Sequence, residues 1–162
     1  MVLDAVIALA YQFGYLGIFL AALIGSASII FPLPASLITF TFGALLNPLL
    51  VGLAAGVGSA IGELTAYAAG FAGAKVFKKK RREQKSVFAA LKRWFSSRRA
   101  FLVIVVFSFV PFAFDIVGLF CGAVRYNIKK FFLATLIGKI LVNLLIAYAG
   151  YYGLTVLAGW LF

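Results

Sequence analysis

Long apolar runs dominate the sequence, and the strict alternation of apolar and polar residues that marks a half-buried strand is absent. Four runs have about the 20 residues that a helix needs to cross a membrane. They cover residues 5–24, 49–74, 100–124 and 129–150. The pattern therefore predicts an all-α integral membrane protein, with a single membrane domain over residues 1–162.

Prolines interrupt two of the apolar stretches. Pro111 lies within 100–124, and Pro32 and Pro34 lie within 27–48. Proline lacks the backbone N–H that a helix needs, and its ring clashes with the preceding turn. Broken backbone at membrane depth is tolerated only where protein or trapped water satisfies it. We therefore expect two re-entrant helical hairpins, each broken at its prolines, and an additional N-terminal helix ahead of them.

Basic residues flank the second hairpin on both sides. The segment 75–99 before it has eleven basic residues and one acidic residue, and Arg125, Lys129 and Lys130 follow it. Short loops rich in Lys and Arg stay in the cytoplasm. We therefore expect this hairpin to enter and leave at the cytoplasmic face, with 75–99 and the N-terminus on that side. A kinked helix that spans the membrane remains the alternative for 100–124.

The two hairpin segments share a residue pattern at a constant offset of 79. The pattern is a proline, a polar residue four positions later, an aliphatic pair and a Gly-Ala dipeptide. In each half a hairpin (27–48 or 100–124) precedes a spanning helix (49–74 or 129–150). The sequence therefore predicts an inverted repeat, an architecture in which transporter sites lie near the midplane. The matched residues are Pro32 with Pro111, Ser36 with Asp115, and Gly43 with Gly122.

Charged residues are rare within the apolar stretches, and each of them needs an explanation. Glu63 is the sole charged residue between Ala5 and Ala74. A charge at the centre of a bilayer costs about 2.5 to 3.5 kcal/mol on insertion scales, so such groups are expected to face protein or a water-filled cavity. The residues predicted to bind or move a substrate are Asp115, Glu63, Lys139, Asn143 and Ser36.

Two of these predictions have alternatives that the sequence leaves open. Glu63 could be a structural carboxyl, either neutral or hydrogen-bonded to a neighbouring helix. Lys139 could pair with Glu63 or Asp115, because a buried lysine either pairs with a carboxylate or loses its proton. It could also extend its ammonium group to the cytoplasmic interface, since it lies about two turns into its helix.

Glycines are concentrated in 49–74, where two pairs have G-x-x-x-G spacing. This spacing lets another helix approach closely. The Gly-Ala dipeptides of the two hairpins add one glycine each. The residues predicted to pack helices together are Gly52, Gly56, Gly58, Gly62, Gly43 and Gly122.

The net charge of +11 lies mostly in 75–99. Positive-inside topology and anionic lipid headgroups explain this charge more simply than nucleic acid does. An apolar stripe within the segment predicts an amphipathic helix that lies in the membrane interface. The residues expected to contact anionic headgroups at the cytoplasmic face are Lys78, Lys79, Lys80, Arg81, Arg82 and Trp94.

The sequence offers little for catalysis or metal binding. It has no histidine and a single cysteine, so a zinc site cannot be assembled. It offers neither a nucleophile with a base nor a phosphate-binding loop. We therefore expect no enzyme activity, no metal and no cofactor.

Three ordered motifs resemble the DedA family, which is also called the SNARE-associated or VTT-domain family. The resemblance covers roughly Phe31 to Gly138. It implies paired re-entrant hairpins, residence in the cell membrane, and a role in moving lipids or lipid carriers between leaflets, linked in some members to the proton gradient. The motifs are FPLPASLITFTFGALLNP, IGELTAYAAGFAG and FVPFAFDIVGLFCGAVRYNIKKFF.

The chain departs from the family pattern at two places. Many members have an acidic residue ahead of the first proline motif, where this chain has only Ser26 and Ser28. Two arginines around the second proline of those members map to Ser108 and Phe114 here. The chain resembles instead a YqaA-like subgroup with the motif P-F-x-x-D-I-V-G-L, in which Asp115 takes the polar role.

The leading functional expectation is movement of a phospholipid or a polyprenyl-phosphate carrier between leaflets, with coupling to protons as an option. A small ion or solute transporter that uses the same carboxylates is the first alternative. A membrane-organising protein whose basic loop binds anionic lipid is the second. Membrane lipids are the expected partners, nucleic acid is not, and a homo-oligomer is compatible with the sequence.

Overall fold

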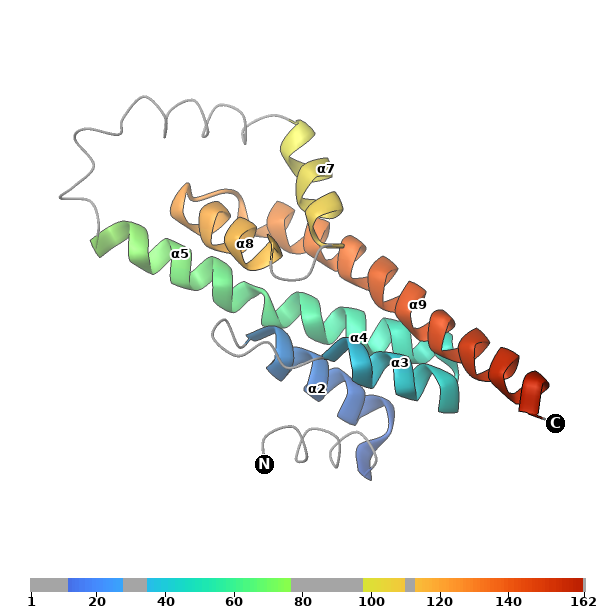
Figure 1. The fold of residues 1–162 in the computed structure, drawn as a ribbon. Helices are drawn as coiled ribbons and strands as arrows, with labels where there is room; N and C mark the ends of the chain where they lie inside the picture. The colour runs from blue at the N-terminus through green and yellow to red at the C-terminus, as the bar shows by residue number, and fades with distance from the viewer. Residues whose placement is uncertain (1–11, 28–34, 77–97, 110–112, 162) are drawn as a thin grey trace. The chain divides into compact units, whose positions relative to one another are not determined.

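The computed structural model describes residues 12–27, 35–76, 98–109 and 113–161 (Figure 1). All regular secondary structure within these ranges is helical, which confirms the predicted all-α class for the described part of the chain. The helices are α2 (Tyr15–Ala27), α3 (Ala35–Leu45), α4 (Pro48–Gly62), α5 (Leu64–Val76), α7 (Arg98–Phe107), α8 (Ala113–Ala123) and α9 (Ile128–Leu161).

Among the described residues, two helical stretches are long and apolar enough to cross a membrane. One is Pro48–Ala74, 27 residues that include α4, Glu63 and most of α5, and the other is Ile128–Gly153, 26 residues of α9. At about 1.5 Å per residue each is about 40 Å long, which exceeds the hydrocarbon thickness of about 30 Å. By contrast, α2 and α3 have 13 and 11 residues, and α7 and α8 have 10 and 11.

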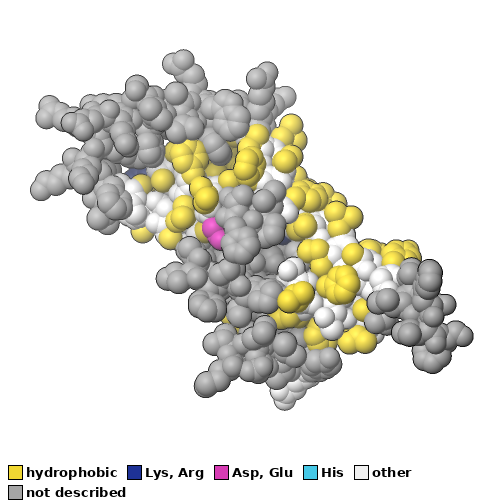
Figure 2. Space-filling view, in the orientation of Figure 1, with side chains coloured by type: hydrophobic (Ala, Val, Ile, Leu, Met, Phe, Trp, Pro, Cys, Tyr) yellow, Lys and Arg dark blue, Asp and Glu magenta, His cyan; other side chains and the backbone are white. Residues whose placement is uncertain are grey.

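Large apolar side chains are exposed along the described helices, and hydrophobic groups dominate the described part of the face shown in Figure 2. On α9 the exposed residues recur every fourth position, which places them on one side of the helix. A soluble protein rarely exposes so much contiguous apolar surface. This surface therefore fits contact with lipid, and its residues on α9 include Leu133, Ile137, Leu141 and Leu145.

Both long stretches begin at an asparagine cap. The Oδ1 atom of Asn47 accepts hydrogen bonds from the backbone N–H groups two and three residues later, at 3.0 and 3.3 Å. Asn127 does the same at 3.0 and 3.1 Å. These bonds satisfy N–H groups that the first turn of a helix leaves without partners. Pro48 follows its cap at the helix position where proline is best tolerated.

The turn between α8 and α9 contains Arg125, whose φ angle of 56° is in the left-handed region. The N–H of Tyr126 donates to the carbonyl of Cys121 at 2.9 Å, and that of Arg125 donates to the carbonyl of Gly122 at 3.1 Å. This pair of bonds is the Schellman arrangement that ends many helices, usually with glycine in the left-handed position. The turn therefore ends α8 and leads into the cap at Asn127.

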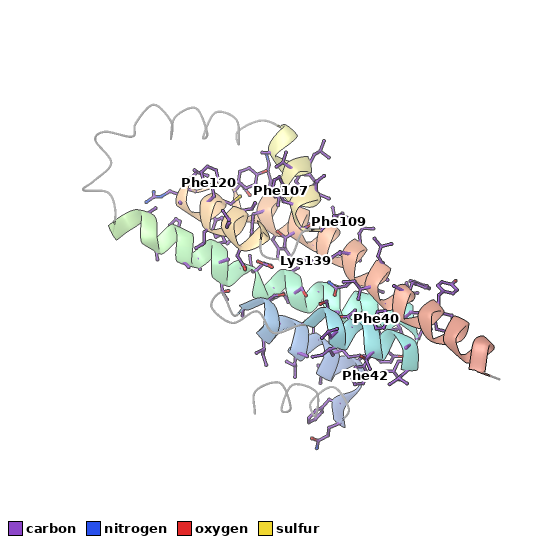
Figure 3. The ribbon with its side chains drawn as sticks, viewed as in Figure 1. Phe40, Phe42, Phe107, Phe109, Phe120 and Lys139 are labelled. Carbon is purple, nitrogen blue, oxygen red and sulfur yellow. The ribbon has the colours of Figure 1, made fainter. Side chains whose placement is uncertain are left out.

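The chain divides into two compact units. Unit 1 combines Met1–Gly62 with Lys139–Phe162, so it contains α2, α3, α4 and the later part of α9. In this unit α2 packs against α4, and α3 contacts both (Figure 1). Figure 3 labels Phe42, which is buried in the core, and Phe40, which is exposed on the same helix. The core residues are Ile18, Ala21, Ala22, Ile38, Phe42, Val51, Ala55 and Ala147.

Unit 2 is the continuous segment Glu63–Gly138. It contains α5, α7, α8 and the first part of α9. Helix α5 packs against α8, and α7 also contacts α8. Its core has a larger share of aromatic side chains than that of unit 1. The core residues are Tyr67, Ala100, Ile104, Cys121, Phe131 and Ala134.

Glycines make close contacts at matching places in the two units. In unit 1, a Cβ atom at Gly43 of α3 would overlap the backbone carbonyl of Ala147 in α9. In unit 2, a Cβ atom at Gly122 of α8 would overlap the carbonyl of Tyr67 in α5. The sequence numbers of Gly43 and Gly122 differ by 79, and those of Tyr67 and Ala147 differ by 80. The same contact is thus made twice, once in each unit.

A second glycine contact is also made once in each unit. A Cβ atom at Gly150 of α9 would overlap the carbonyl of Phe40 in α3, and one at Gly70 of α5 would overlap that of Leu119 in α8. The offset between Phe40 and Leu119 is again 79, and that between Gly70 and Gly150 is 80. The offset changes from 79 to 80 between the Gly-Ala dipeptides and the capping asparagines, the interval that contains Arg125.

Glycines of the first long stretch face two different helices within unit 1. Gly52 and Gly56 lie against Leu144 and Ile140 of α9, where an added Cβ would come within 2.6 Å of the nearest atoms. The other pair, Gly58 and Gly62, lies against α2, at the backbone of Phe19, Leu23 and Ala27. Small residues at such interfaces let helix backbones approach closely.

Candidate functional site

Glu63 lies between α4 and α5, within an apolar stretch of spanning length. Its side chain is 4% exposed, and its Oε2 atom is shielded from solvent. Its backbone carbonyl accepts a hydrogen bond from the N–H of Tyr67 at 3.3 Å. Ser59 and Tyr67, one turn to either side, are also buried. These three residues are spaced four positions apart, so they share one face of the helical stretch, and this face is buried.

Asp115 lies in the first turn of α8 and is partly exposed. The N-terminus of a helix carries a partial positive charge, which stabilises a carboxylate in the first turn. Gly118, one turn later on the same helix, faces Ala66 of α5. Pro111 itself lies outside the described residues.

Unit 1 contains a buried polar pair that links α3 to α9. The Oγ1 of Thr39 donates a hydrogen bond to Oδ1 of Asn143 at 3.3 Å. The Nδ2 of Asn143 donates in turn to the backbone carbonyl of Lys139 at 2.8 Å. Thr39 is 1% exposed and Asn143 is 7% exposed. Lys139 is partly buried, and Figure 3 labels it on α9.

Different interactions join the helices of unit 2. The hydroxyl of Tyr67 donates to the backbone carbonyl of Tyr126 at 2.5 Å, and its ring packs against that of Phe131 with centroids 5.2 Å apart. The guanidinium of Arg125 lies 5.2 Å from the ring centroid of Phe71, a cation–π distance. Burial, together with the Cys121 thiol, raises the pKa of the Tyr126 phenol.

Two small hydroxyl side chains are buried in unit 2. Ser108, at the end of α7, donates to the carbonyl of Val105 at 2.5 Å and lies against Gly138 of α9. Thr135 is fully buried, and its Oγ1 makes no hydrogen bond to any residue that the structure describes. These hydroxyls extend the polar character of the unit 2 interior beyond Glu63.

The structure places the predicted substrate residues in different surroundings. Lys139 and Asn143 are joined by a hydrogen bond in unit 1, whereas Ser36 is exposed in the first turn of α3. Glu63 and Asp115 both belong to unit 2. The predictions that fall outside the described residues concern Pro32, Pro34, Pro111, Lys78, Lys79, Lys80, Arg81, Arg82 and Trp94.

Sequence reasoning missed Thr39 and the carbonyl of Tyr126. Thr39 carries a weak signal, because it is a polar residue one turn after Ser36 in an apolar helix. The carbonyl of Tyr126 carries none, since a backbone acceptor is present at every residue. Groups of three or more residues suited to hold a metal ion are absent from the described residues.

These features define a helical membrane protein with polar side chains buried among apolar helices. A family model of the VTT domain matches residues 33–152. The chain therefore belongs to the VTT-domain family, the DedA or SNARE-associated family. Comparisons with curated proteins and with solved structures give no match.

Family membership fixes the general class of the protein. VTT-domain proteins are membrane proteins that are generally thought to be transport-related, and the family is not known for enzyme activity. With the two long apolar stretches, membership confirms the predicted membrane class. The YqaA-like assignment within the family stays a prediction.

Proposed function

We propose that this protein moves an amphiphile, a phospholipid or a polyprenyl-phosphate carrier, between the leaflets of the cell membrane. The observation that carries the proposal is the burial of Glu63 within an apolar stretch of spanning length. A carboxyl group within a membrane-spanning stretch is costly, and it is by default a candidate for a substrate or proton pathway. The exposed apolar side chains of the same helices suit the lipid tails.

The matching contacts of the two units support an internal repeat. In each unit, the second short helix lies against a stretch of spanning length at a glycine, and the contacts match at sequence offsets of 79 and 80. Helix α3, which lies within 27–48, and helices α7 and α8, which cover most of 100–124, are each shorter than the about 20 residues needed to cross. We therefore propose that the segments 27–48 and 100–124 are the two re-entrant hairpins. Their opposite entry into the membrane would make an inverted repeat.

In this proposal the polar headgroup contacts the side chains of Ser36, Glu63, Asp115, Lys139 and Asn143, while the tails stay in lipid. Glu63 or Asp115 takes up and releases the proton if transport is proton-coupled. The N-terminus and residues 75–99 lie in the cytoplasm, where Lys78, Lys79, Lys80, Arg81, Arg82 and Trp94 contact anionic headgroups.

A liposome assay tests the proposal. Purified protein is reconstituted in vesicles that contain a fluorescent phospholipid, and dithionite quenches only the outer leaflet. Wild-type protein is expected to expose the inner pool within the assay, and Asp115→Asn is expected to slow this exchange. An analogue of a polyprenyl phosphate is the second probe, because the two lipid classes differ in both headgroup and tail.

The assay also separates the other candidate functions. Exchange no faster than in empty vesicles for both lipids, with flux of an ion or a solute, would favour the solute transporter. If neither lipid nor solute moves, a membrane-organising role is left, and neutralising Lys78–Arg82 would then abolish function while Asp115→Asn leaves it intact. Asp115→Asn protein that exchanges lipid like wild type at every pH would remove Asp115 from the mechanism.

A further inference from the structure

Glu63 and Asn143 occupy equivalent positions in the two long helical stretches. Each follows the asparagine that caps its stretch, Asn47 or Asn127, at an offset of 16 in sequence number. Both side chains are buried. The glycine contacts that match at offsets of 79 and 80 support the same alignment. The equivalent positions thus hold a carboxyl group in unit 2, at Glu63, and a neutral amide in unit 1, at Asn143.

The neighbouring short helix, α3 in unit 1 and α8 in unit 2, also carries different residues in the two units. In unit 1, Thr39 of α3 donates to the Asn143 amide. At the offset of 79, the residue that corresponds to Thr39 is Gly118 of α8, which has no side-chain hydroxyl. Residue 118 therefore cannot donate, in unit 2, the hydrogen bond that Thr39 donates in unit 1. Ser36 precedes Thr39 by one turn, just as Asp115 precedes Gly118.

We propose that Thr39 and Asn143 are positioning residues for transport, and that their bond holds the first turn of α3 in register with α9. This inference rests on the proposed function, because it concerns the placement of Ser36 and Lys139. Thr39 lies one turn after Ser36, and Asn143 lies one turn after Lys139 and bonds to its carbonyl. One hydrogen bond thereby fixes the first turn of α3 relative to the turn of α9 that contains Lys139.

The physical reason is the surroundings of the bond. Both partners are almost fully buried, so water cannot replace a lost partner. A buried polar pair in a low-dielectric interior favours one relative placement of its two helices when it is fully satisfied. Residue 118 is a glycine and makes no such side-chain bond, so it does not hold the first turn of α8, which contains Asp115.

Hydrogen–deuterium exchange and lipid exchange together test the inference in protein reconstituted in nanodiscs and in vesicles. Thr39→Val keeps the shape of the side chain and removes the hydroxyl, and Thr39→Ser keeps the hydroxyl. Thr41→Val is the matched control, because Thr41 is exposed on the same helix. Asn143→Leu removes the other partner of the bond.

Thr39→Val and Asn143→Leu are expected to raise amide exchange in α3 by about two- to tenfold, the range that corresponds to a hydrogen bond of typical net strength. Lipid exchange per folded protein should fall in Thr39→Val, which replaces no residue that is proposed to contact the headgroup. Thr39→Ser should restore both readouts, and Thr41→Val should leave both unchanged.

Unchanged amide exchange in Thr39→Val would overturn the inference, since the bond would then not hold α3. Faster amide exchange with unchanged lipid exchange would also overturn it, because the bond would be structural only. Failure of the proposed function has a different signature, in which wild-type protein moves no lipid while the amide exchange of α3 still depends on Thr39.

Discussion

The hydroxyl of Tyr67 in α5 donates a hydrogen bond of 2.5 Å to the backbone carbonyl oxygen of Tyr126, just beyond the end of α8. The ring of the same tyrosine packs against Phe131 in the first turn of α9. Tyr67 therefore joins α5, the turn after α8 and the start of α9 within unit 2. Its equivalent in unit 1 is Ala147, which packs without a hydroxyl.

Tyr67→Phe should lower the stability of the protein by about 0.5 to 1.5 kcal/mol, the usual net contribution of one hydrogen bond. The ring contact with Phe131 is kept, so the loss reports on the hydroxyl alone. Thermal unfolding in detergent measures the effect as a lower Tm. Tyr148→Phe is the control, because Tyr148 is exposed. Equal Tm values for Tyr67→Phe and wild type would show that the bond adds nothing.

Gly122→Ala should destabilise the protein by about 1 to 3 kcal/mol, the usual cost of overpacking a tight interface. The added Cβ would overlap the carbonyl of Tyr67, which is backbone and cannot move aside alone. Gly73→Ala is the control, since no described atom beyond its chain neighbours and the backbone of its own helix lies within 4 Å of a Cβ there. That variant should keep or raise the Tm, because alanine favours helix over glycine. A Gly122→Ala protein as stable as Gly73→Ala would contradict the close approach.

Asn127→Ala should cost about 1 kcal/mol, because it removes the acceptor of two N–H groups at the start of α9. Asn127→Asp and Asn127→Ser keep a capping oxygen and should recover most of the lost stability. Thermal unfolding measures the difference. Loss of the same stability in all three variants would mean that the asparagine acts other than as a cap.

Cys121 should react slowly with a maleimide in the native protein and rapidly after unfolding in SDS. It is the single cysteine of the chain, and its side chain is buried in the core of unit 2. Lys129→Cys in a Cys121→Ala background is the reference, because Lys129 is exposed. Native Cys121 that labels as fast as the cysteine of this reference variant would contradict the packing of unit 2.

The sequence predicts the class of the fold well, for physical reasons. Long apolar runs in a lipid solvent leave few options besides helices, so the all-α membrane class follows from composition and run length. The motifs around FPLPAS and FAFDIV indicate the family, and the family model confirms this assignment. The period of the helix places Ser59, Glu63 and Tyr67 on one face, and the structure shows that all three are buried.

The pairing of side chains across helices is harder to predict. The bond between Thr39 and Asn143 joins residues 104 positions apart and depends on the register between α3 and α9. Helical periodicity indicates which residues share a face of each helix. It does not indicate the register, along the helix axes, in which two faces pack. The division of α9 between the two units at Lys139 is also not predicted, because the apolar helical pattern continues on both sides of Gly138 and Lys139.

The most direct test of the central claim compares Glu63→Gln with Glu83→Gln in the vesicle assay. Both changes replace one carboxyl group by an amide, but Glu83 belongs to the basic segment 75–99 and Glu63 is buried in a spanning stretch. We expect fast lipid exchange by wild type and Glu83→Gln, and much slower exchange by Glu63→Gln at equal amounts of folded protein. Exchange by Glu63→Gln at the wild-type rate across the pH range would contradict a role for the buried carboxyl in transport.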